Sequence, residues 1–291
     1  VIAAAVADVN TFSGTPTATL GDAHTLAELV AINNALTGTL TLNDVTVALT
    51  GSAADIKAAL AGTFAAGYTG NVTINDANGT GIAATDITAI EAATTGTVTV
   101  SNNINLTGTS AQIAAAVADV NTFSGTPTAT LGDAHTLAEL KAINNALSGT
   151  LTLNDYTVAL SGSSADVAAA LAGTFADTYS GTATLNDNHT LAELVAINNG
   201  TTGNITLNSN AVALTGSTSD VKAALAGNVG AAYTGNIVLN DADNTSIAAA
   251  DITTIESDTT GTITVSNNIR LTGNSDVIAA AVADVNTFSG T

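Results

Sequence analysis

The sequence predicts an α/β fold: an open right-handed α/β solenoid of about ten strand–helix coils, a parallel sheet with helices on one side. Three observations lead to this prediction. The first fifteen residues return at the end of the chain, Ser/Thr-Gly turns recur at regular intervals, and each turn precedes a short alternating run and then an amphipathic segment.

The repeated segment is VIAAAVADVNTFSGT. It covers residues 1–15, returns unchanged at 277–291, and is repeated at 113–126 in all but its first residue, where Gln112 stands. A chain that ends on the segment with which it begins is expected to be a piece of a longer array.

The Ser/Thr-Gly turns divide the chain into unequal coils of 22 to 32 residues, and neighbouring coils pair into a two-coil repeat of about 55 residues. We therefore expect residues 1–291 to form a single repeat array without caps. The turn glycines are Gly14, Gly38, Gly70, Gly96, Gly125, Gly149, Gly181, Gly203, Gly235, Gly261 and Gly290, and the approximate repeats are 14–69, 70–124, 125–180, 181–234 and 235–289.

Each coil begins with a strand. Residues 39–42, for example, read Thr-Leu-Thr-Leu, and this period-two alternation is typical of a half-buried strand. Turn residues such as Asn43-Asp44 then end the strand. The long coils carry a second extended run, as at 45–49 or 104–106. This run is either a second side of the coil or the return strand of a hairpin.

Helix starts follow the turns. Thr25 with Glu28, and the same pair in two later copies, form capping boxes, and Ser52 with Asp55 is a variant that uses Asp. Apolar residues then recur at helical spacing, as at Leu26, Leu29 and Ile32.

The lengths of the elements fit a coil. A four-residue strand spans about 13 Å and a ten-residue helix about 15 Å, so the chain can return one strand further along. Strands stack about 4.8 Å apart whereas helices need about 8–10 Å, and unequal coils are expected to stagger the helices and relieve this mismatch. A closed barrel needs a fixed strand number, which an array that restarts on its own first segment does not have.

Composition excludes several kinds of partner. Four Lys or Arg stand against 24 Asp or Glu, a formal charge of −20, so neither nucleic acid nor an anionic membrane surface is expected to bind. No apolar run reaches 18 residues, which predicts no membrane insertion. The absence of Cys removes disulfides and thiolate sites. No basic leader precedes Val1, so any export signal is expected outside the segment.

The candidate catalytic residues are His24, His135 and His189, which directly precede the capping Thr in three coils. Because they are copies of one position, we expect exposed loop residues rather than a joint site. No nucleophile elbow, phosphate-binding loop or zinc-protease motif occurs, so no enzyme activity and no cofactor are expected.

Calcium is a possible ligand. Asp residues that follow Asn at strand ends would stack into a column of oxygen ligands along one edge of the array. The alternative is that Asn-Asp only makes the turn. The residues are Asp44, Asp76, Asp155, Asp187 and Asp241.

Threonines form a possible outward face. If the aliphatic residues of each strand point at the helices, the alternating Thr point away from them. Such an array resembles the ice-binding face of β-solenoid antifreeze proteins, although solvent-facing Thr also simply suit a sheet. The residues are Thr39, Thr41, Thr97, Thr99, Thr150, Thr152, Thr262 and Thr264.

Three phrases carry a resemblance that covers the whole chain: HTLAELVAINN, ATDITAIEAATTGTVTVSNNINLTGT and GSAADIKAALAGT. They resemble the tandem repeats of giant Ala/Thr-rich secreted surface proteins of marine cyanobacteria and other bacteria. The resemblance implies an extracellular or cell-surface location and a structural or adhesive role, and it transfers no site residue.

The function expected is therefore the structural shaft of an extracellular filament or of a giant cell-surface or adhesin protein. Its partners would be further repeats of the same protein, end to end, with lateral bundling as an added possibility. The alternatives are a Thr-face module that binds ice or polysaccharide, and a calcium-stabilised repeat protein similar to those of surface layers.

Overall fold

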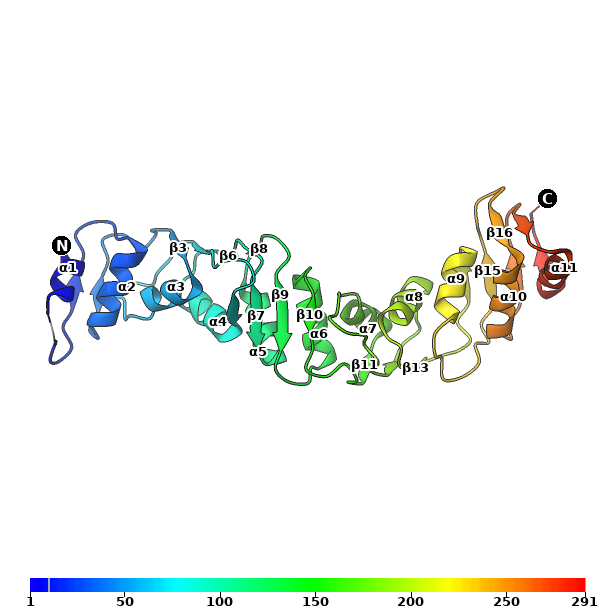
Figure 1. Ribbon diagram of the computed structural model, residues 1–291, viewed down its shortest axis with the longest axis horizontal. Helices are drawn as coiled ribbons and strands as arrows, with labels where there is room; N and C mark the ends of the chain where they lie inside the picture. Colours follow the sequence, from blue (N-terminus) through cyan, green and yellow to red (C-terminus); the bar gives the residue numbers. More distant parts are fainter. Residues whose placement is uncertain (10, 291) are drawn as a thin grey trace. The chain divides into compact units, whose positions relative to one another are not determined.

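Strands and helices alternate along the whole of residues 1–9 and 11–290, which the computed structural model describes. The predicted fold class is confirmed: the chain is a repeated strand–helix α/β solenoid and not a closed barrel (Figure 1). It divides into two compact units, residues 1–134 with 145–154 and residues 135–144 with 155–291. Both units are built from the same kinds of coil.

The first unit holds five helices and ten strands among its described residues. These are α1 (Ile2–Ala7), β1 (Ala18–Thr19), α2 (Leu26–Ala35), β2 (Leu40–Thr41), β3 (Leu49–Gly51), α3 (Ala53–Leu60), β4 (Val72–Ile74), β5 (Gly81–Ala83), α4 (Ala84–Ala93), β6 (Val98–Val100), β7 (Asn105–Gly108), α5 (Ser110–Asp119), β8 (Thr122–Phe123), β9 (Thr128–Leu131) and β10 (Leu151–Thr152).

The second unit begins with α6 (Leu137–Ala146), which belongs to it as far as residue 144. Its other elements are β11 (Leu160–Gly162), α7 (Ser164–Leu171), β12 (Ala183–Leu185), α8 (Leu191–Gly200), β13 (Ile205–Thr206), β14 (Leu214–Gly216), α9 (Thr218–Leu225), β15 (Ile237–Leu239), β16 (Ser246–Ala248), α10 (Ala249–Asp258), β17 (Ile263–Val265), β18 (Arg270–Thr272), α11 (Ser275–Asp284) and β19 (Thr287–Phe288).

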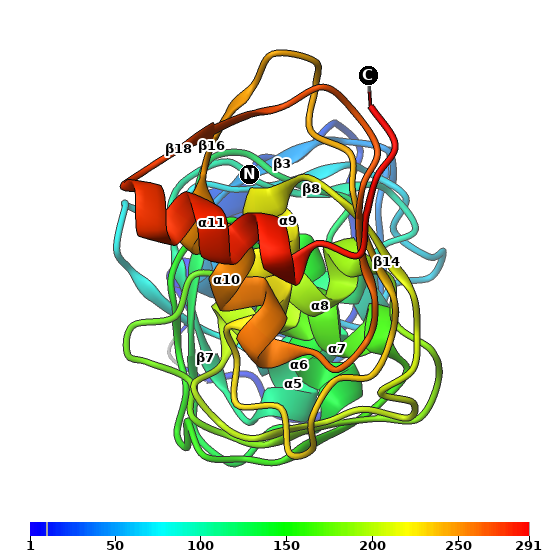
Figure 2. The ribbon, with the colours of Figure 1, turned by 90° about the vertical axis from the view of Figure 1, so that its right-hand side faces the viewer.

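The second extended run of the long coils is a second side of the coil and not a hairpin. β3 pairs in parallel with β4, and β7 pairs in parallel with β5 and β9, so each run joins neighbouring coils instead of folding back. A coil thus has one helical side and up to two extended sides. In the end-on view, β16 and β18 lie on one side of α10 and α11, and β14 lies on the other (Figure 2).

Strands form several short parallel sheets instead of one continuous sheet. In the described part of the first unit the strand orders are β1-β2, β3-β4-β6-β8 and β5-β7-β9-β10, and in that of the second they are β11-β12-β13, β14-β15-β17-β19 and β16-β18. The first strand of each four-stranded sheet leads into a helix, and the last one follows a helix. Because none of these sheets exceeds four strands, the mismatch between strand and helix spacing accumulates over few coils before a new sheet begins.

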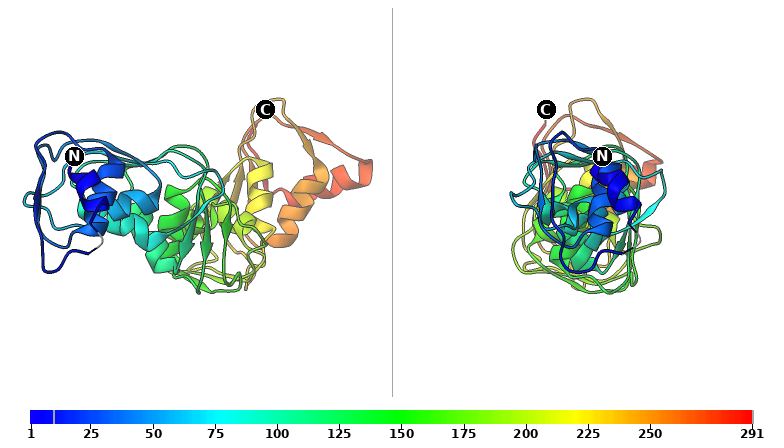
Figure 3. Two further views of the ribbon diagram at one scale, coloured as in Figure 1. Left: turned by 60° about the vertical axis from the view of Figure 1, so that its left-hand side comes forward. Right: turned by 90° about the vertical axis from the view of Figure 1, so that its left-hand side faces the viewer.

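The core runs along the inside of the coils. In the sheet β3-β4-β6-β8, Leu49, Val72 and Val98 lie in register and are at most 1% exposed. The helices contribute one face each; α2, for example, buries Leu29 and Ile32 and leaves Asn34 exposed. Successive helices pack on one another in chain order from α1 to α5 in the first unit and from α7 to α11 in the second, and the colours of Figure 3 let these helices be followed along the chain. Each coil therefore needs the next one to cover it.

The Ser/Thr-Gly turns are the places where the backbones of consecutive coils touch. A Cβ built on Gly96 would overlap the carbonyl oxygen of Gly70, and Gly203 stands in the same relation to Gly181. At Gly96, Gly203 and Gly261 a buried Thr fixes the contact: Thr94 Oγ1, for example, donates to Gly70 O (2.8 Å) and accepts from Gly96 N (3.0 Å). Glycine recurs at these turns because no side chain fits between the coils.

Four kinds of coil recur, and we name them by their sequence. IAAAVAD coils carry α1, α5 and α11; TLAEL coils carry α2, α6 and α8; SxxD coils carry α3, α7 and α9; DIT coils carry α4 and α10. In chain order they run IAAAVAD, TLAEL, SxxD, DIT, IAAAVAD, TLAEL, SxxD, TLAEL, SxxD, DIT, IAAAVAD. The repeat of about 55 residues is thus half of a four-coil order, with one extra TLAEL–SxxD pair at α8 and α9.

Replacing Gly96 with Ala is expected to lower the free energy of unfolding by about 1–3 kcal/mol, because the new methyl group must push two backbones apart. Gly67→Ala is the matched control, since nothing lies within 4 Å of its Cβ position and its φ is ordinary. The control should be neutral or gain up to about 1 kcal/mol. Urea unfolding of both variants measures this, and equal effects would contradict the close-contact explanation.

Candidate functional site

The three histidines are buried, and the prediction of exposed loop residues is wrong. His24, His135 and His189 are 4%, 3% and 2% exposed. Each lies one residue before the capping Thr of a TLAEL helix, and its Nε2 meets the hydroxyl of a tyrosine 44 residues further on, at 3.1, 3.0 and 3.0 Å. The partners are Tyr68, Tyr179 and Tyr233.

Each tyrosine also reaches a carbonyl of the coil between. Tyr68 Oη donates to Val47 O at 2.6 Å. The corresponding distances are 2.7 Å from Tyr179 to Val158 and 2.6 Å from Tyr233 to Val212. One His–Tyr–Val cluster therefore ties three consecutive coils together. It forms because each TLAEL coil carries a His directly before its helix. The Ser/Thr-Gly turn that opens the second coil after it carries the Tyr.

The single hydroxyl proton fixes the tautomer of the histidine. Since Tyr68 donates its proton to the Val47 carbonyl, its oxygen must accept from His24, so the neutral imidazole carries its proton on Nε2. Nδ1 of His24 and of His189 is buried without a hydrogen-bond partner. A second proton placed there would have nothing to bond to.

Burial favours the neutral form of His24 and of His189. Desolvation lowers the pKa of His24 below its usual value, and the nearby Asp44 and Glu28 offset only part of this. The pKa of His189 is lowered by the same cause. Burial also raises the pKa of Tyr68 to about 12. A neutral imidazole buried in this way is suited to holding coils together.

The predicted helix caps are present. Thr25 N donates to Glu28 Oε2 (2.9 Å), and Glu28 N donates to Thr25 Oγ1 (3.3 Å). The copies at Thr136 and Thr190 make the same pairs of bonds. Asp55 N donates to Ser52 Oγ at 3.1 Å, as the Asp variant requires. The glutamates of the TLAEL coils therefore have a structural role.

A second set of caps crosses from coil to coil, and the sequence analysis missed it. In each case a carboxylate accepts the N–H of the first helical residue 23 positions earlier in the chain. The pairs are Asp76 with Ala53 (2.8 Å), Asp133 with Ser110 (2.6 Å), Asp187 with Ser164 (2.7 Å) and Asp241 with Thr218 (3.0 Å). Negative charge at a helix N-terminus is stabilising, so these bonds hold each strand end to the preceding helix.

The five aspartates proposed for calcium fall into two different sets. Asp76, Asp187 and Asp241 are the coil-to-coil caps described above. Asp44 and Asp155 instead close turns: Asp44 Oδ1 accepts from Thr46 N (2.8 Å) and Thr46 Oγ1 (2.7 Å), and these bonds lower its pKa. In the described part of the chain, no group of three or more His, Cys, Asp or Glu could hold a metal ion. Calcium binding stays a prediction.

The proposed Thr face is distributed over four sheets. Thr39 and Thr41 flank Leu40 in β2, and the three other pairs lie at β6, β10 and β17, so no two pairs share a sheet. One longer row exists that the sequence did not single out: Thr50, Thr73, Thr99 and Thr122 stand in register across β3, β4, β6 and β8. All four are exposed or half-exposed.

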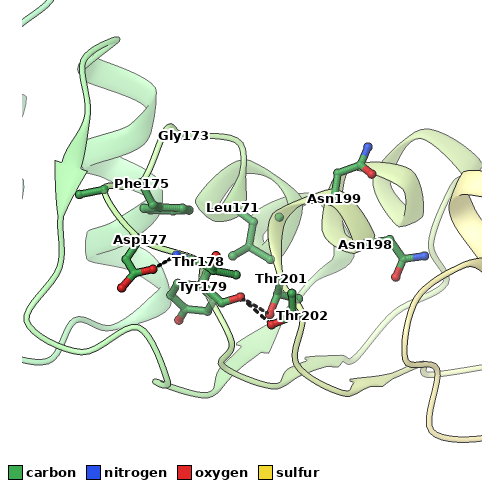
Figure 4. A pocket seen from close by; sticks show the side chains of 12 residues that line it. Leu171, Gly173, Phe175, Asp177, Thr178, Tyr179, Asn198, Asn199, Thr201 and Thr202 are labelled. Carbon is green, nitrogen blue, oxygen red and sulfur yellow. Dashed lines mark hydrogen bonds between the residues drawn. The ribbon is translucent and has the colours of Figure 1, made fainter.

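A pocket of about 480 Å³ lies between the C-terminal ends of α7 and α8 (Figure 4). Two threonine hydroxyls of the lining bond to the backbone: Thr201 Oγ1 donates to Gly181 O at 2.7 Å, and Thr202 Oγ1 donates to Tyr179 O at 3.4 Å. Asp177, the one carboxylate in the lining, accepts from Thr178 N at 2.7 Å. A smaller pocket of about 250 Å³ occupies the same position between α9 and α10, so the pocket belongs to the repeat.

Three of the four basic residues also bridge coils. Lys57 pairs with Asp86 at 2.5 Å, and Lys141 pairs with Asp166 and Lys222 with Asp251. These pairs are partly exposed, so each adds little to the free energy of unfolding. Each pair places a positive charge on one helix beside a negative charge on the next. Among the described residues, no helix combines the length and the apolar character needed to cross a membrane.

Comparison with models of protein families finds no match, and neither the curated proteins nor the solved structures compared with the chain match it.

Acid is expected to lower the stability of the folded chain. The folded-state pKa values of His24 and His189 lie below the unfolded value of about 6.5, so the unfolded chain binds protons more readily. The melting temperature should be level above about pH 7 and fall between about pH 6.5 and 5. A variant with Gln at all three histidines should show a shallower slope in this window by circular dichroism, and equal slopes would contradict the assignment.

Removal of one coil-to-coil cap should be measurable. Asp187→Ala is expected to lower the free energy of unfolding by about 0.5–2 kcal/mol, whereas Asp187→Asn keeps an acceptor and should lose about 0.3–1 kcal/mol. Asp177→Asn is the control, because its carboxylate bonds only to its own turn. Unfolding with calcium and with chelator separates the roles: a shift in melting temperature that Asp187→Asn removes would favour a calcium site over a cap.

Proposed function

We propose that this chain is a structural repeat array, the shaft of an extracellular filament or of a giant cell-surface or adhesin protein, without catalytic activity. One observation carries the proposal. The three histidines, the aspartates of the coil-to-coil caps and three of the four basic side chains are used to bond one coil to the next.

The histidines illustrate this point. A catalytic imidazole needs an open path to its substrate, whereas His189 is 2% exposed and bonds to Tyr233, whose hydroxyl donates to Val212 O. The aspartates at the strand ends bond to the preceding helix, as Asp76 does to Ala53. Asn33 likewise donates its amide to the Ala59 carbonyl near the end of the next helix.

Such an arrangement suits a mechanical role. Backbone pairing, the turn contacts and the side-chain clusters all act between neighbouring coils, so stability grows with the number of coils. The same contacts recur in each copy, which lets the array vary in length without a change in local structure. Further repeats of the same protein are the partners that this geometry fits.

Composition agrees with an exterior location. A net charge of −20 keeps the surface solvated and separates laterally adjacent chains, and the Thr- and Asn-rich outer faces need no reducing compartment. Lateral bundling would then need cations to screen the charge.

The register of Thr50, Thr73, Thr99 and Thr122 favours a second candidate, a Thr-face module that binds ice or polysaccharide. Thermal hysteresis and glycan-array binding of the full chain test it. Replacement of Thr73 and Thr99 by Lys should abolish either signal, since these two lie at the centre of the row.

Tandem duplication of residues 16–126 within the full chain tests the structural proposal. The junction is natural, because residues 2–15 and 113–126 are identical. We expect the total free energy of unfolding and its denaturant dependence to rise together with the added coils. A duplicated segment that unfolds separately, and leaves the unfolding of the parent chain unchanged, would contradict the proposal. Imaging of the native source should show thin fibres at the cell surface.

A further inference from the structure

We propose that the pocket between the C-terminal ends of α7 and α8 binds a protonated amino sugar such as glucosamine. The inference adds a ligand site to the proposed structural function and does not depend on that function. We call this pocket the joint pocket, and the smaller pocket between α9 and α10 the sister pocket.

The joint pocket lies where the order of coils changes. At α3–α4 and α9–α10 an SxxD coil is followed by a DIT coil, whereas at α7–α8 it is followed by a TLAEL coil. The end of α8 therefore brings Asn199 and Gly200 to the positions that Ser257 and Asp258 hold in the sister pocket. The joint pocket measures about 480 Å³ and the sister pocket about 250 Å³. Since ligand pockets typically measure about 300–1,000 Å³, only the joint pocket of the two reaches the size of a ligand site.

One wall of the joint pocket differs from its copies. This wall is the turn after α7, where residues 175–179 read FADTY, whereas the copies at 64–68 and 229–233 read FAAGY and VGAAY. Asp177 and Thr178 thus stand where the copies have only Ala or Gly. Among the three SxxD coils, only this turn offers a carboxylate and a hydroxyl at these two positions.

The opposite wall, formed by the end of α8, also differs from its copies (Figure 4). Gly200 stands where the other TLAEL coils have Ala35 and Ala146. A Cβ on Gly200 would lie 2.6 Å from the Cβ of Leu171, so the glycine lets the end of α8 approach the end of α7. The sequence thus departs from its repeat on both sides of the same pocket.

The charges around the joint pocket favour a cationic ligand. Asp177 is exposed, and the lining contains no Lys, Arg or His. The C-terminal ends of α7 and α8 each add partial negative charge, and the whole chain carries −20. Phosphates and acidic sugars are repelled by such a site. A single carboxylate suits one ammonium group, whereas Ca²⁺ needs six to eight oxygen ligands.

An aromatic side chain in the lining provides a contact for the carbon face of a sugar. Phe175 is half-buried, and its ring lies 5.6 Å from the ring of Tyr179, at an interplanar angle of 36°. Tyr179 is itself held by His135 at 3.0 Å and by Val158 O at 2.7 Å. The aromatic wall is therefore fixed before a ligand arrives, which lowers the entropic cost of binding. An aromatic ring also attracts a nearby cation.

The remaining polar side chains suit hydroxyl groups. Thr178 and Asn199 are exposed, and their hydroxyl and amide groups can both donate and accept hydrogen bonds. An amino sugar combines the three features that the pocket matches: an ammonium group for Asp177, a carbon face for Phe175 and hydroxyls for these two side chains.

The expected affinity is modest, because the ligand is small and the pocket is open to solvent. We expect a dissociation constant of about 1 mM for glucosamine. Glucose has a hydroxyl in place of the ammonium and should bind about five- to thirtyfold more weakly at low ionic strength. Salt should reduce this preference, since it screens the charge on Asp177.

Isothermal titration calorimetry of the full chain at about pH 7 tests the site, with glucosamine, N-acetylglucosamine and glucose as probes. Asp177→Asn should weaken glucosamine binding about threefold or more and leave glucose binding unchanged. Phe175→Val, which copies Val229 of the sister pocket, should weaken both sugars about fivefold. Asp258→Asn is the matched control, because it removes the carboxylate of the sister pocket and should change neither affinity. Circular dichroism melting shows that each variant is folded.

Three outcomes would overturn the proposal: no saturable binding of glucosamine, equal binding of glucosamine and the two neutral sugars, or equal effects of Asp177→Asn and Asp258→Asn. A chitosan tetramer distinguishes the source of the sugar. Tighter binding of the tetramer than of glucosamine would support a polysaccharide residue as the ligand, and equal or weaker binding would support the free sugar. A chain that binds none of these sugars yet gains stability with added coils would retain the proposed structural function without this site.

Discussion

The constraint on which the structure depends is the distance between consecutive coils at the Ser/Thr-Gly turns. At most of these turns the backbone of one coil lies so close to the next that only a glycine fits, and at Gly96, Gly203 and Gly261 a buried Thr bonds the two turns. Once this spacing is set, the strands pair in parallel. The aliphatic side chains between strands and helices then lie in register from one coil to the next. The glycines therefore act as packing residues as well as turn residues.

Polar contacts between coils make the register of neighbouring coils specific. A coil of about 25 residues has too little apolar area to fold alone, so it depends on neighbours for both burial and hydrogen bonds. The His–Tyr–Val cluster spans three coils, and the aspartate caps and the Asn33 type of amide contact each span two. Buried polar groups that are satisfied only by a neighbour make the register between coils specific, since a slipped coil would leave them unpaired.

Local features could be read from the sequence, and contacts between coils could not. Alternation, turn residues and capping boxes predicted strands such as β2 and the start of α2, because these depend on neighbours in sequence. The burial of His24 depends on Tyr68, 44 residues away, and the division into short sheets depends on which strands of adjacent coils align. One signal could have found the cluster: every His is followed by a Tyr at a spacing of 44 residues. The cap from Asp187 to Ser164 has the same character, with a spacing of 23.

The extra TLAEL–SxxD pair at α8 and α9 shows what these contacts allow. It interrupts the four-coil order, yet His189, Tyr233 and Val212 meet at 3.0 and 2.6 Å, nearly as His135, Tyr179 and Val158 do at 3.0 and 2.7 Å. Each coil thus responds to its neighbours and not to its place in the chain. A protein built in this way can gain or lose coils while every local environment is kept, which is what a structural array needs and what a unique catalytic or binding site would not tolerate.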